Sequence, residues 1–278
     1  MKNNNIVKIY LVGGLGNNLF QIFYASLLKK NGYQVILFDN LLYSSFFTKI
    51  MGWTIHDSEL HHFNIEFDIK KNPIIYFIMD FFRLFISRII FKPFLGANYS
   101  SDFNDNLDLF SDPFKLQSGY FQEHKYLKID ELKEFAKSCS IKNDTKSKEN
   151  NEEKAAIHIR GGDKSETNFI FTFYNKCIVN LKNKKSVIYT NDKIFAKSIL
   201  ENIKKDNKDF IFSNNNKAIE DFISIAKSSE IICADSTFSF WAAIYSDANQ
   251  IFMPLHSEIL ENKVLKQDLA SNNYFFLI

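Results

Sequence analysis

The sequence predicts an α/β fold built on open, doubly wound parallel sheets. A strand, a glycine turn, a helix and a second strand follow one another near the N-terminus, which is typical of a parallel βαβ unit. A polar, charged stretch at residues 138–154 interrupts the chain, and strands and helices then alternate again without a sequence repeat. We therefore expect two domains, residues 1–145 and 146–278.

The first half opens with an apolar run of strand type at residues 6–12 and a glycine turn at residues 13–16. A helix is predicted from about Asn17, which can cap it, to Lys30, because its apolar residues recur at helical spacing. The next apolar run, residues 33–38, is the second strand.

The second half alternates four strands with four helices. The strands are predicted at residues 155–160, 186–190, 209–213 and 230–234, and the helices at residues 171–183, 192–204, 218–227 and 236–245. Ligands of such sheets bind beyond the carboxyl ends of the strands. We therefore expect the functional residues directly after the strands.

Composition excludes several classes of protein. The chain has 278 residues, 46% hydrophobic and 24% charged, which is too apolar for a disordered chain and too polar for a multi-span membrane protein. A formal net charge of +2 gives no support for nucleic-acid binding. The three cysteines are odd in number and too widely spaced for a CxxC metal or redox pair, and a disulfide scaffold is excluded. The polar start lacks a signal-peptide pattern. We expect a cytoplasmic protein with buried, reduced cysteines.

A phenylalanine-rich segment covers residues 73–95. Four charged residues interrupt it (Asp80, Arg83, Arg88 and Lys92), so a membrane-spanning helix is not expected. Two interpretations stay open at this point. The segment is either a helix buried in the core or against the other domain, or an interfacial helix that lies on a membrane.

The first two polar clusters follow predicted strands. GGLGNN, at residues 13–18, places Gly14 and Asn17 at a helix N-terminus, where anions are favoured, although a plain tight turn has the same pattern. HIRGGD, at residues 158–163, places His158 and Arg160 on one side of a strand. Arg160 fits either a diphosphate clamp or a structural pair with Asp163.

Two further clusters follow later strands. Asp192, in YTND, is suited to cap a helix or to accept hydrogen bonds from N1 and N2 of a guanine. Ser236 and Thr237, in ADSTFSFWAA, crowd a helix N-terminus and form either a cap or a phosphate site.

In this order the clusters resemble the bacterial and animal α-1,2-fucosyltransferases of glycosyltransferase family 11. The segment SGYFQEHKYL, at residues 118–127, adds a fifth similar motif. The chain departs from the family pattern at Asn18, Gly161, Asp235 and Phe240. Arg160, which the resemblance makes the phosphate clamp, is retained.

The resemblance implies a GT-B-like fold, with an N-terminal acceptor-side domain facing a C-terminal GDP-sugar domain. It implies an inverting, metal-independent galactoside α-1,2-fucosyltransferase that uses GDP-fucose in the synthesis of a bacterial surface polysaccharide such as O-antigen. No cofactor is expected besides this donor substrate. The expected catalytic residues are Arg160 and Asp163, and the expected substrate-binding residues are Gly14, Asn17, His158, Asp192, Ser236 and Thr237.

Several alternatives remain at this stage. The donor is either GDP-fucose or another GDP-6-deoxyhexose such as colitose, and the acceptor is an oligosaccharide or a lipid-linked glycan. Asp163 and Glu166 are near the clamp in sequence, but neither is assigned as the general base. A non-catalytic GDP-binding or membrane-docking protein and a sugar-nucleotide hydrolase are the other classes. Peripheral contact with the inner face of the plasma membrane would use residues 73–95.

Overall fold

The computed structural model describes residues 6–39, 59–86, 116–117, 127–142, 154–161, 167–183, 185–201, 203 and 209–278. The chain divides into two compact units. The first comprises Met1–Tyr126 with Ser138–Ser140, and the second comprises Leu127–Lys137 with Ile141–Ile278. Of the predicted features, Asp163, Glu166, the motif at residues 118–126 and residues 87–95 lie outside the described residues.

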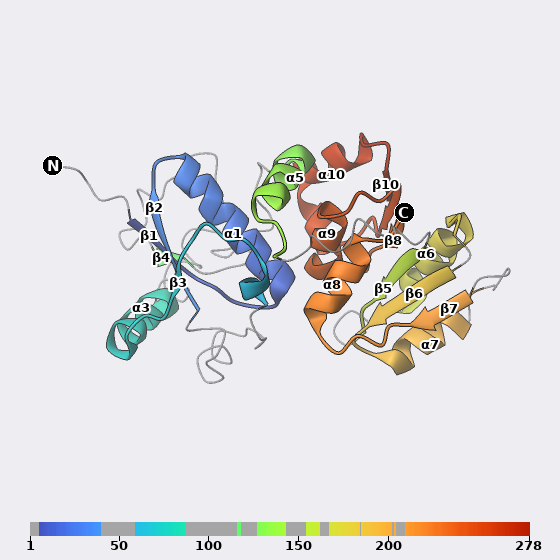
Figure 1. The fold of residues 1–278 in the computed structure, drawn as a ribbon, viewed down its shortest axis with the longest axis horizontal. Helices are drawn as coiled ribbons and strands as arrows, with labels where there is room; N and C mark the ends of the chain where they lie inside the picture. Colours follow the sequence, from blue (N-terminus) through green and yellow to red (C-terminus); the bar gives the residue numbers. More distant parts are fainter. Residues whose placement is uncertain are drawn as a thin grey trace. The chain divides into compact units, whose positions relative to one another are not determined.

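The first unit is a parallel α/β unit around a four-stranded sheet of order β3-β2-β1-β4 (Figure 1). Its described elements are β1 (Ile6–Tyr10), α1 (Leu15–Lys30), β2 (Gln34–Phe38), the short 3-10 helix η1 (Leu60–His62), β3 (Ile69–Lys70), α3 (Ile74–Ile86) and β4 (Leu116–Gln117). The predicted strand–turn–helix–strand order is confirmed for β1, α1 and β2.

The turn between β1 and α1 depends on two glycines. Gly13 has a φ of 78°, a left-handed conformation that glycine adopts without steric cost. Gly14 is the N-cap of α1, and no side chain caps this end of the helix. The prediction that Asn17 caps the helix was wrong, because α1 begins two residues earlier and Asn17 lies within its first turn.

Helix α3 accounts for the described part of the phenylalanine-rich segment. Phe77, Asp80 and Phe81 form one buried stripe at helical spacing, whereas the remaining described apolar side chains of α3 are exposed. The helix is therefore not a buried core helix. No helix within the described residues has the length and apolar character needed to cross a membrane.

The second unit is a doubly wound α/β unit around a six-stranded sheet of order β10-β9-β8-β5-β6-β7 (Figure 1). Every neighbouring pair of strands is parallel. The strands are β5 (Ala155–Ile159), β6 (Lys185–Thr190), β7 (Asp209–Phe212), β8 (Glu230–Ile232), β9 (Gln250–Met253) and β10 (Phe275–Leu277). The helices are α5 (Ile129–Ser138), α6 (Thr167–Asn180), α7 (Lys193–Glu201), α8 (Ala218–Ala226), α9 (Thr237–Ile244), the 3-10 helix η5 (Glu258–Glu261) and α10 (Lys263–Ala270).

The core of the second unit surrounds β5, whose five residues are all buried. Ile157, Ile188 and Ile232 lie on neighbouring strands and pack with apolar side chains of α6 and α7. All three cysteines are buried and none forms a disulfide, which confirms that they act as small core residues. Burial raises the pKa of the Cys233 thiol to about 12, so this thiol stays protonated.

Helix α5 belongs to the second unit, although it precedes the polar stretch that the sequence indicates as a boundary. The Phe135 ring lies 5.6 Å from that of Trp241 in α9, and the Lys133 ammonium lies 4.2 Å from the Tyr274 ring centroid. The carboxylate of Asp268 accepts from the Ile129 backbone N–H. These contacts hold α5 in the second unit, which composition does not reveal because they are long-range in sequence.

Candidate functional site

The site expected from the sequence lies at the carboxyl edge of the second sheet. The chain runs from β5 outward through β6 to β7 and then returns to β8, on the other side of β5. The order of strands therefore reverses between β5 and β8, and open α/β sheets bind ligands in the crevice at such a point. His158 and Arg160 come from the end of β5, Asp192 follows β6, and Ser236 and Thr237 follow β8, so three predicted clusters meet at this edge.

Arg160 links the two sides of this switch point. One guanidinium nitrogen, Nη1, lies 3.5 Å from the hydroxyl oxygen of Ser236, and the Arg160 side chain is partly exposed. Ser236 is the N-cap of α9, and its hydroxyl accepts from the Phe238 backbone N–H at 3.3 Å. A helix N-terminus carries partial positive charge, and here a full positive charge lies beside it. This combination favours the binding of an anion at the start of α9.

His158, near the end of β5 and close to Arg160, is an uncharged imidazole. Its side chain is 8% exposed, and its Nδ1 has no hydrogen-bond partner among the described residues. Burial, together with the smaller effect of the neighbouring positive charge of Arg160, lowers the pKa of His158 to about 3. The ring lies 5.6 Å from that of Phe238. A buried ring nitrogen without a partner is costly, so it is suited to a hydrogen bond with a ligand.

Asp192 caps helix α7. Its Oδ1 accepts from the backbone N–H groups of Ile194 and Phe195, at 3.1 and 3.0 Å. The same side chain packs against Gly161 at the end of β5, where an added Cβ would lie 2.7 Å from the Asp192 Cβ. The capping interpretation is thus confirmed, and a side chain at position 161 would displace Asp192.

The sequence interpretation missed a polar pocket of about 240 Å³ beside Asp192. It lies at the carboxyl ends of β6 and β7 and is lined by Ile188, Thr190, Lys193, Ser213, Asn214, Asn215, Asn216 and Asp221. Asp221 accepts hydrogen bonds from the Ser213 hydroxyl and the Asn215 amide, at 2.8 and 3.0 Å, and burial raises the pKa of this carboxyl. The run of serine and asparagine directly after β7 was the available signal.

In the first unit, the polar residues after β1 mainly stabilise their own turn. Asn18 is fully buried, and its side-chain amide donates to the Val12 carbonyl at 3.0 Å and to the Gln21 side chain at 3.2 Å. Gln21 in turn donates to the same carbonyl and accepts from the Val12 N–H. Gly14 and Asn17 adjoin this bonded turn, and their predicted contacts with substrate stay predictions.

One group among the described residues has metal-ligand chemistry. Ligand atoms of Glu59, His61 and His62 lie within 4.8 Å of one another. The group belongs to the first unit and contains none of the predicted site residues. Metal independence of the reaction therefore stays a prediction.

Two parallel α/β units, the second with the predicted site residues at its switch point, are typical of the GT-B class of glycosyltransferase fold. The glycosyl transferase family 11 pattern matches residues 35–267, which is most of the chain. The chain belongs to this family.

Comparison with solved structures gives similar proteins at low identity. A variant of Arabidopsis thaliana FUT1 in complex with GDP is 10% identical, with a TM-score of 0.52 over 90% of this chain and 70% of that chain. POFUT1 in complex with GDP-fucose is 11% identical, with a TM-score of 0.35 over 89% of this chain and 95% of that chain. The first shows the shared fold, whereas the second is too dissimilar to support an argument. No curated protein sequence matches the chain significantly.

Proposed function

We propose that this chain is an inverting α-1,2-fucosyltransferase. It moves L-fucose from GDP-fucose to the 2-hydroxyl of a galactoside acceptor in the synthesis of a bacterial surface polysaccharide such as O-antigen. Family membership supports the class of reaction, and the ordered motifs support the donor. The observation that carries the proposal is the pairing of Arg160 with the Ser236 N-cap at the β5–β8 switch point.

The diphosphate of the donor is held by a cation and a helix terminus. Arg160 provides a fork of N–H donors, while Ser236, Thr237 and the first backbone N–H groups of α9 provide hydrogen bonds and the helix dipole. Negative charge grows on GDP as the sugar leaves, so these groups bind the transition state more tightly than the ground state. Preorganised donors of this kind contribute roughly 2.7–4 kcal/mol each when tested by removal.

The nucleoside is bound by the adjoining edge of the sheet. Guanine offers N–H donors at N1 and N2, which a carboxylate accepts and which adenine lacks. Asp192 supplies a carboxylate directly after β6, and Asp221, in the first turn of α8, lines the polar pocket at the ends of β6 and β7. His158 contributes its uncharged ring nitrogen to the sugar or phosphate portion of the donor.

In the reaction, the bond between fucose C1 and the β-phosphate oxygen breaks, and a bond from C1 to the acceptor 2-hydroxyl oxygen forms. The acceptor approaches from the face opposite the diphosphate, so the configuration at C1 is inverted. The acceptor proton leaves to a base or to water, and GDP departs with the electron pair. We also propose that Asp163 is a catalytic residue and that Gly14 and Asn17 bind substrate.

The test is incubation of the purified protein with GDP-fucose and a panel of β-galactoside acceptors, followed by linkage analysis of the product. We expect stoichiometric release of GDP and an α-1,2 linkage. A parallel reaction with GDP-colitose tests the alternative donor. This comparison is needed because the chain departs from the family pattern at Gly161. Tight GDP binding without transfer would favour a non-catalytic protein, and free fucose without an acceptor would favour a hydrolase.

A further inference from the structure

Helix α3 presents a continuous apolar face to the outside of the first unit. At about 100° per residue, its exposed apolar side chains cover about 200° of the helix circumference, and its buried side chains occupy the remaining stripe. The exposed residues are Ile74, Ile75, Tyr76, Ile78, Met79 and Phe82, with 37–69% of each residue's surface accessible.

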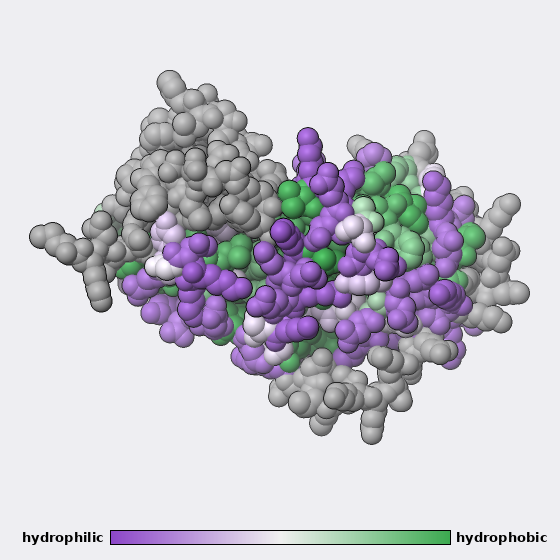
Figure 2. Space-filling model, turned by 90° about the horizontal axis from the view of Figure 1, so that it is seen from above, coloured by the Kyte–Doolittle hydropathy of each residue, from purple (hydrophilic) through white to green (hydrophobic). Residues whose placement is uncertain are grey.

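This concentration is unusual for the molecule. These six residues are half of the twelve large hydrophobic residues exposed within the described part of the chain. The other six are spread over α6, α7, β7, α10 and β10. In Figure 2, hydrophobic areas lie among hydrophilic residues. Scattered exposed apolar residues are normal, whereas a contiguous apolar face marks an interaction surface.

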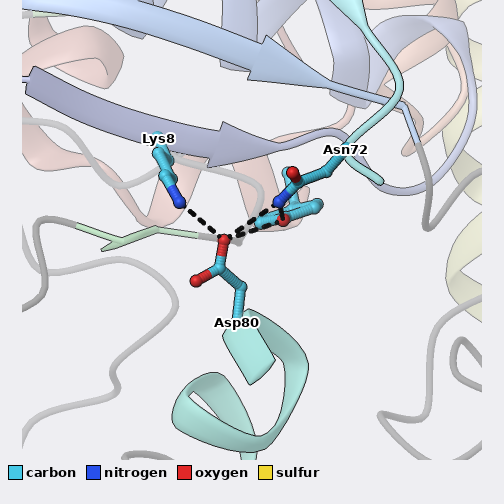
Figure 3. A network of polar contacts seen from close by, with 4 residues as sticks. Lys8, Asn72 and Asp80 are labelled. Atoms are coloured by element: carbon cyan, nitrogen blue, oxygen red, sulfur yellow. Dashed lines mark hydrogen bonds and ion pairs between the residues drawn. The ribbon is translucent and has the colours of Figure 1, made fainter. Parts of the chain in front are cut away.

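A buried carboxylate fixes which way this helix faces. Asp80 is 2% exposed, and its Oδ2 accepts from the Lys8 ammonium at 2.9 Å, the Tyr10 hydroxyl at 3.0 Å and the Asn72 amide at 3.1 Å. Figure 3 shows Asp80 rising from α3 toward Lys8 on strand β1 and Asn72. Rotating the helix to bury its apolar face would expose Phe77 and Phe81 and break this paired charge, which is costly. The outward direction of the apolar face is therefore determined by the fold.

The sequence around α3 is rich in positive charge. Lys70 and Lys71 precede α3 directly and are exposed. The chain from Lys70 to Lys92 has five lysines and arginines but a single acid, Asp80, which is buried in its ion pair. An apolar helical face bordered by cations complements an anionic lipid surface.

We infer that α3 is an interfacial helix that docks the protein on an anionic lipid bilayer. Its apolar face enters the boundary between headgroups and acyl chains, and the lysines before it contact the lipid phosphates. Tyr76 lies at the edge of the exposed face, where a ring with one polar end suits the membrane interface. The inference does not depend on the sugar donor or on catalysis, because it rests on this helix alone.

The first test is co-sedimentation of the full chain with vesicles of phosphatidylcholine containing about one-third phosphatidylglycerol. We expect binding to these vesicles and little binding to pure phosphatidylcholine. The triple variant Ile75→Gln, Met79→Gln and Phe82→Gln should lower the partition coefficient by more than about tenfold. The double variant Lys70→Gln and Lys71→Gln should lower it by several-fold for each lysine, and only on the anionic vesicles.

Matched controls come from the second unit. Val179 and Ile194 are as exposed as the residues of α3, so Val179→Gln with Ile194→Gln should leave vesicle binding unchanged. Thermal unfolding of every variant checks that the fold is retained. If the wild type fails to bind anionic vesicles, or if the control pair lowers binding as much as the α3 variant, the inference is overturned. Loss of self-association in the α3 variant, without lipid binding by the wild type, would identify a second copy as the occupant instead.

A fluorescent reporter gives an independent readout. Tyr76→Trp places an indole on the proposed contact face, and anionic vesicles should shift its emission to shorter wavelength. A tryptophan in place of Ile194 serves as the control and should not respond. An unchanged Tyr76→Trp spectrum in the presence of bound vesicles would show that another surface makes the contact and would reject α3 as the docking element.

Discussion

The turn after β1 and the turn after β5 occupy equivalent places in the two units but use their polar residues differently. After β1, the side chains of Asn18 and Gln21 bond to the Val12 backbone and to each other. After β5, Arg160 reaches the N-cap of α9, and the Nδ1 of His158 has no hydrogen-bond partner among the described residues. Most polar groups of the first turn bond within the turn itself, although the buried Oδ1 of Asn18 also has no hydrogen-bond partner among the described residues. The second turn instead directs a cation to a helix N-terminus. A glycine-rich turn at a strand end therefore does not by itself indicate a binding site.

The strongest test of this difference is Arg160→Ala. We expect transfer from GDP-fucose to fall by about 10²–10³-fold in kcat, because the departing diphosphate loses its charged donor. The measurement is steady-state kinetics of GDP release with a galactoside acceptor. Arg160→Lys should recover part of the activity, since it keeps the charge but not the planar fork. Wild-type turnover by Arg160→Ala would remove Arg160 from the proposed mechanism.

Asn18→Ala probes the turn after β1, whose polar side chains bond mainly to the backbone of the same turn. We expect the free energy of unfolding to fall by about 1–3 kcal/mol, because buried backbone groups lose hydrogen bonds that the side chain supplies. The measurement is urea denaturation, and kcat per folded molecule should change little. Its neighbour is the matched comparison: Asn17→Ala should raise KM with a smaller loss of stability. A large loss of kcat in Asn18→Ala at full stability would show that the first turn also acts in catalysis.

The pH dependence of stability tests the buried imidazole. Burial lowers the pKa of His158 to about 3 in the folded protein, while an unfolded histidine titrates near 6.5. The unfolded chain therefore takes up a proton first as the pH falls below about 6.5, and the folded state loses stability down to about pH 3. By pH 5.5 the contribution of this residue should be a loss of about 1.4 kcal/mol.

His158→Gln is the control for this pH effect, because glutamine does not titrate. Denaturation between pH 7.5 and 5.5 should show a shallower loss of stability in the variant than in the wild type. Identical slopes would mean that His158 is protonated normally in the folded protein and would contradict its assignment as a neutral group at the site.

Gly161→Ala should have the smallest effect. The new Cβ would lie 2.7 Å from the Asp192 Cβ, so the carboxylate must shift. We expect GDP affinity to fall by a few-fold and the α7 cap to weaken by about 1 kcal/mol or less, measured by calorimetric titration and thermal unfolding. Gly32→Ala is the matched control, because Gly32 has a φ of +84° with open space around it. It should lower stability by about 1–2 kcal/mol without changing GDP affinity.

Much of the fold was predictable because its signals are local. The predicted strands overlap β1, β2 and β5 to β8, and the predicted helices overlap α1 and α6 to α9. Their starts and ends differed by a few residues, since helix termini depend on caps that sequence patterns define poorly. Helix α10 and strands β9 and β10 were not predicted, and the last strand is held by pairing with β9.

The predicted site was more complete in the second unit than in the first. The ends of β5, β6 and β8 each carried a recognisable polar cluster, so Arg160, His158, Asp192 and Ser236 could be selected before their positions were known. The pocket around Asp221 was missed because it is formed by two strand ends that meet only when β6 and β7 pair. The structural use of Asn18 was missed because buried and ligand-binding amides give the same sequence pattern.

The sequence alone determined the parallel α/β class, the order of the motifs and the chemical groups available at each strand end, since these depend on local apolar periodicity and residue type. Only the tertiary structure decided that β8 lies beside β5, which brings Arg160 to the start of α9. The tertiary structure also decided which face of α3 points outward. A helix that is apolar on most of its faces has no preferred rotation from its sequence, and the bonds of Asp80 to Lys8, Tyr10 and Asn72 selected one.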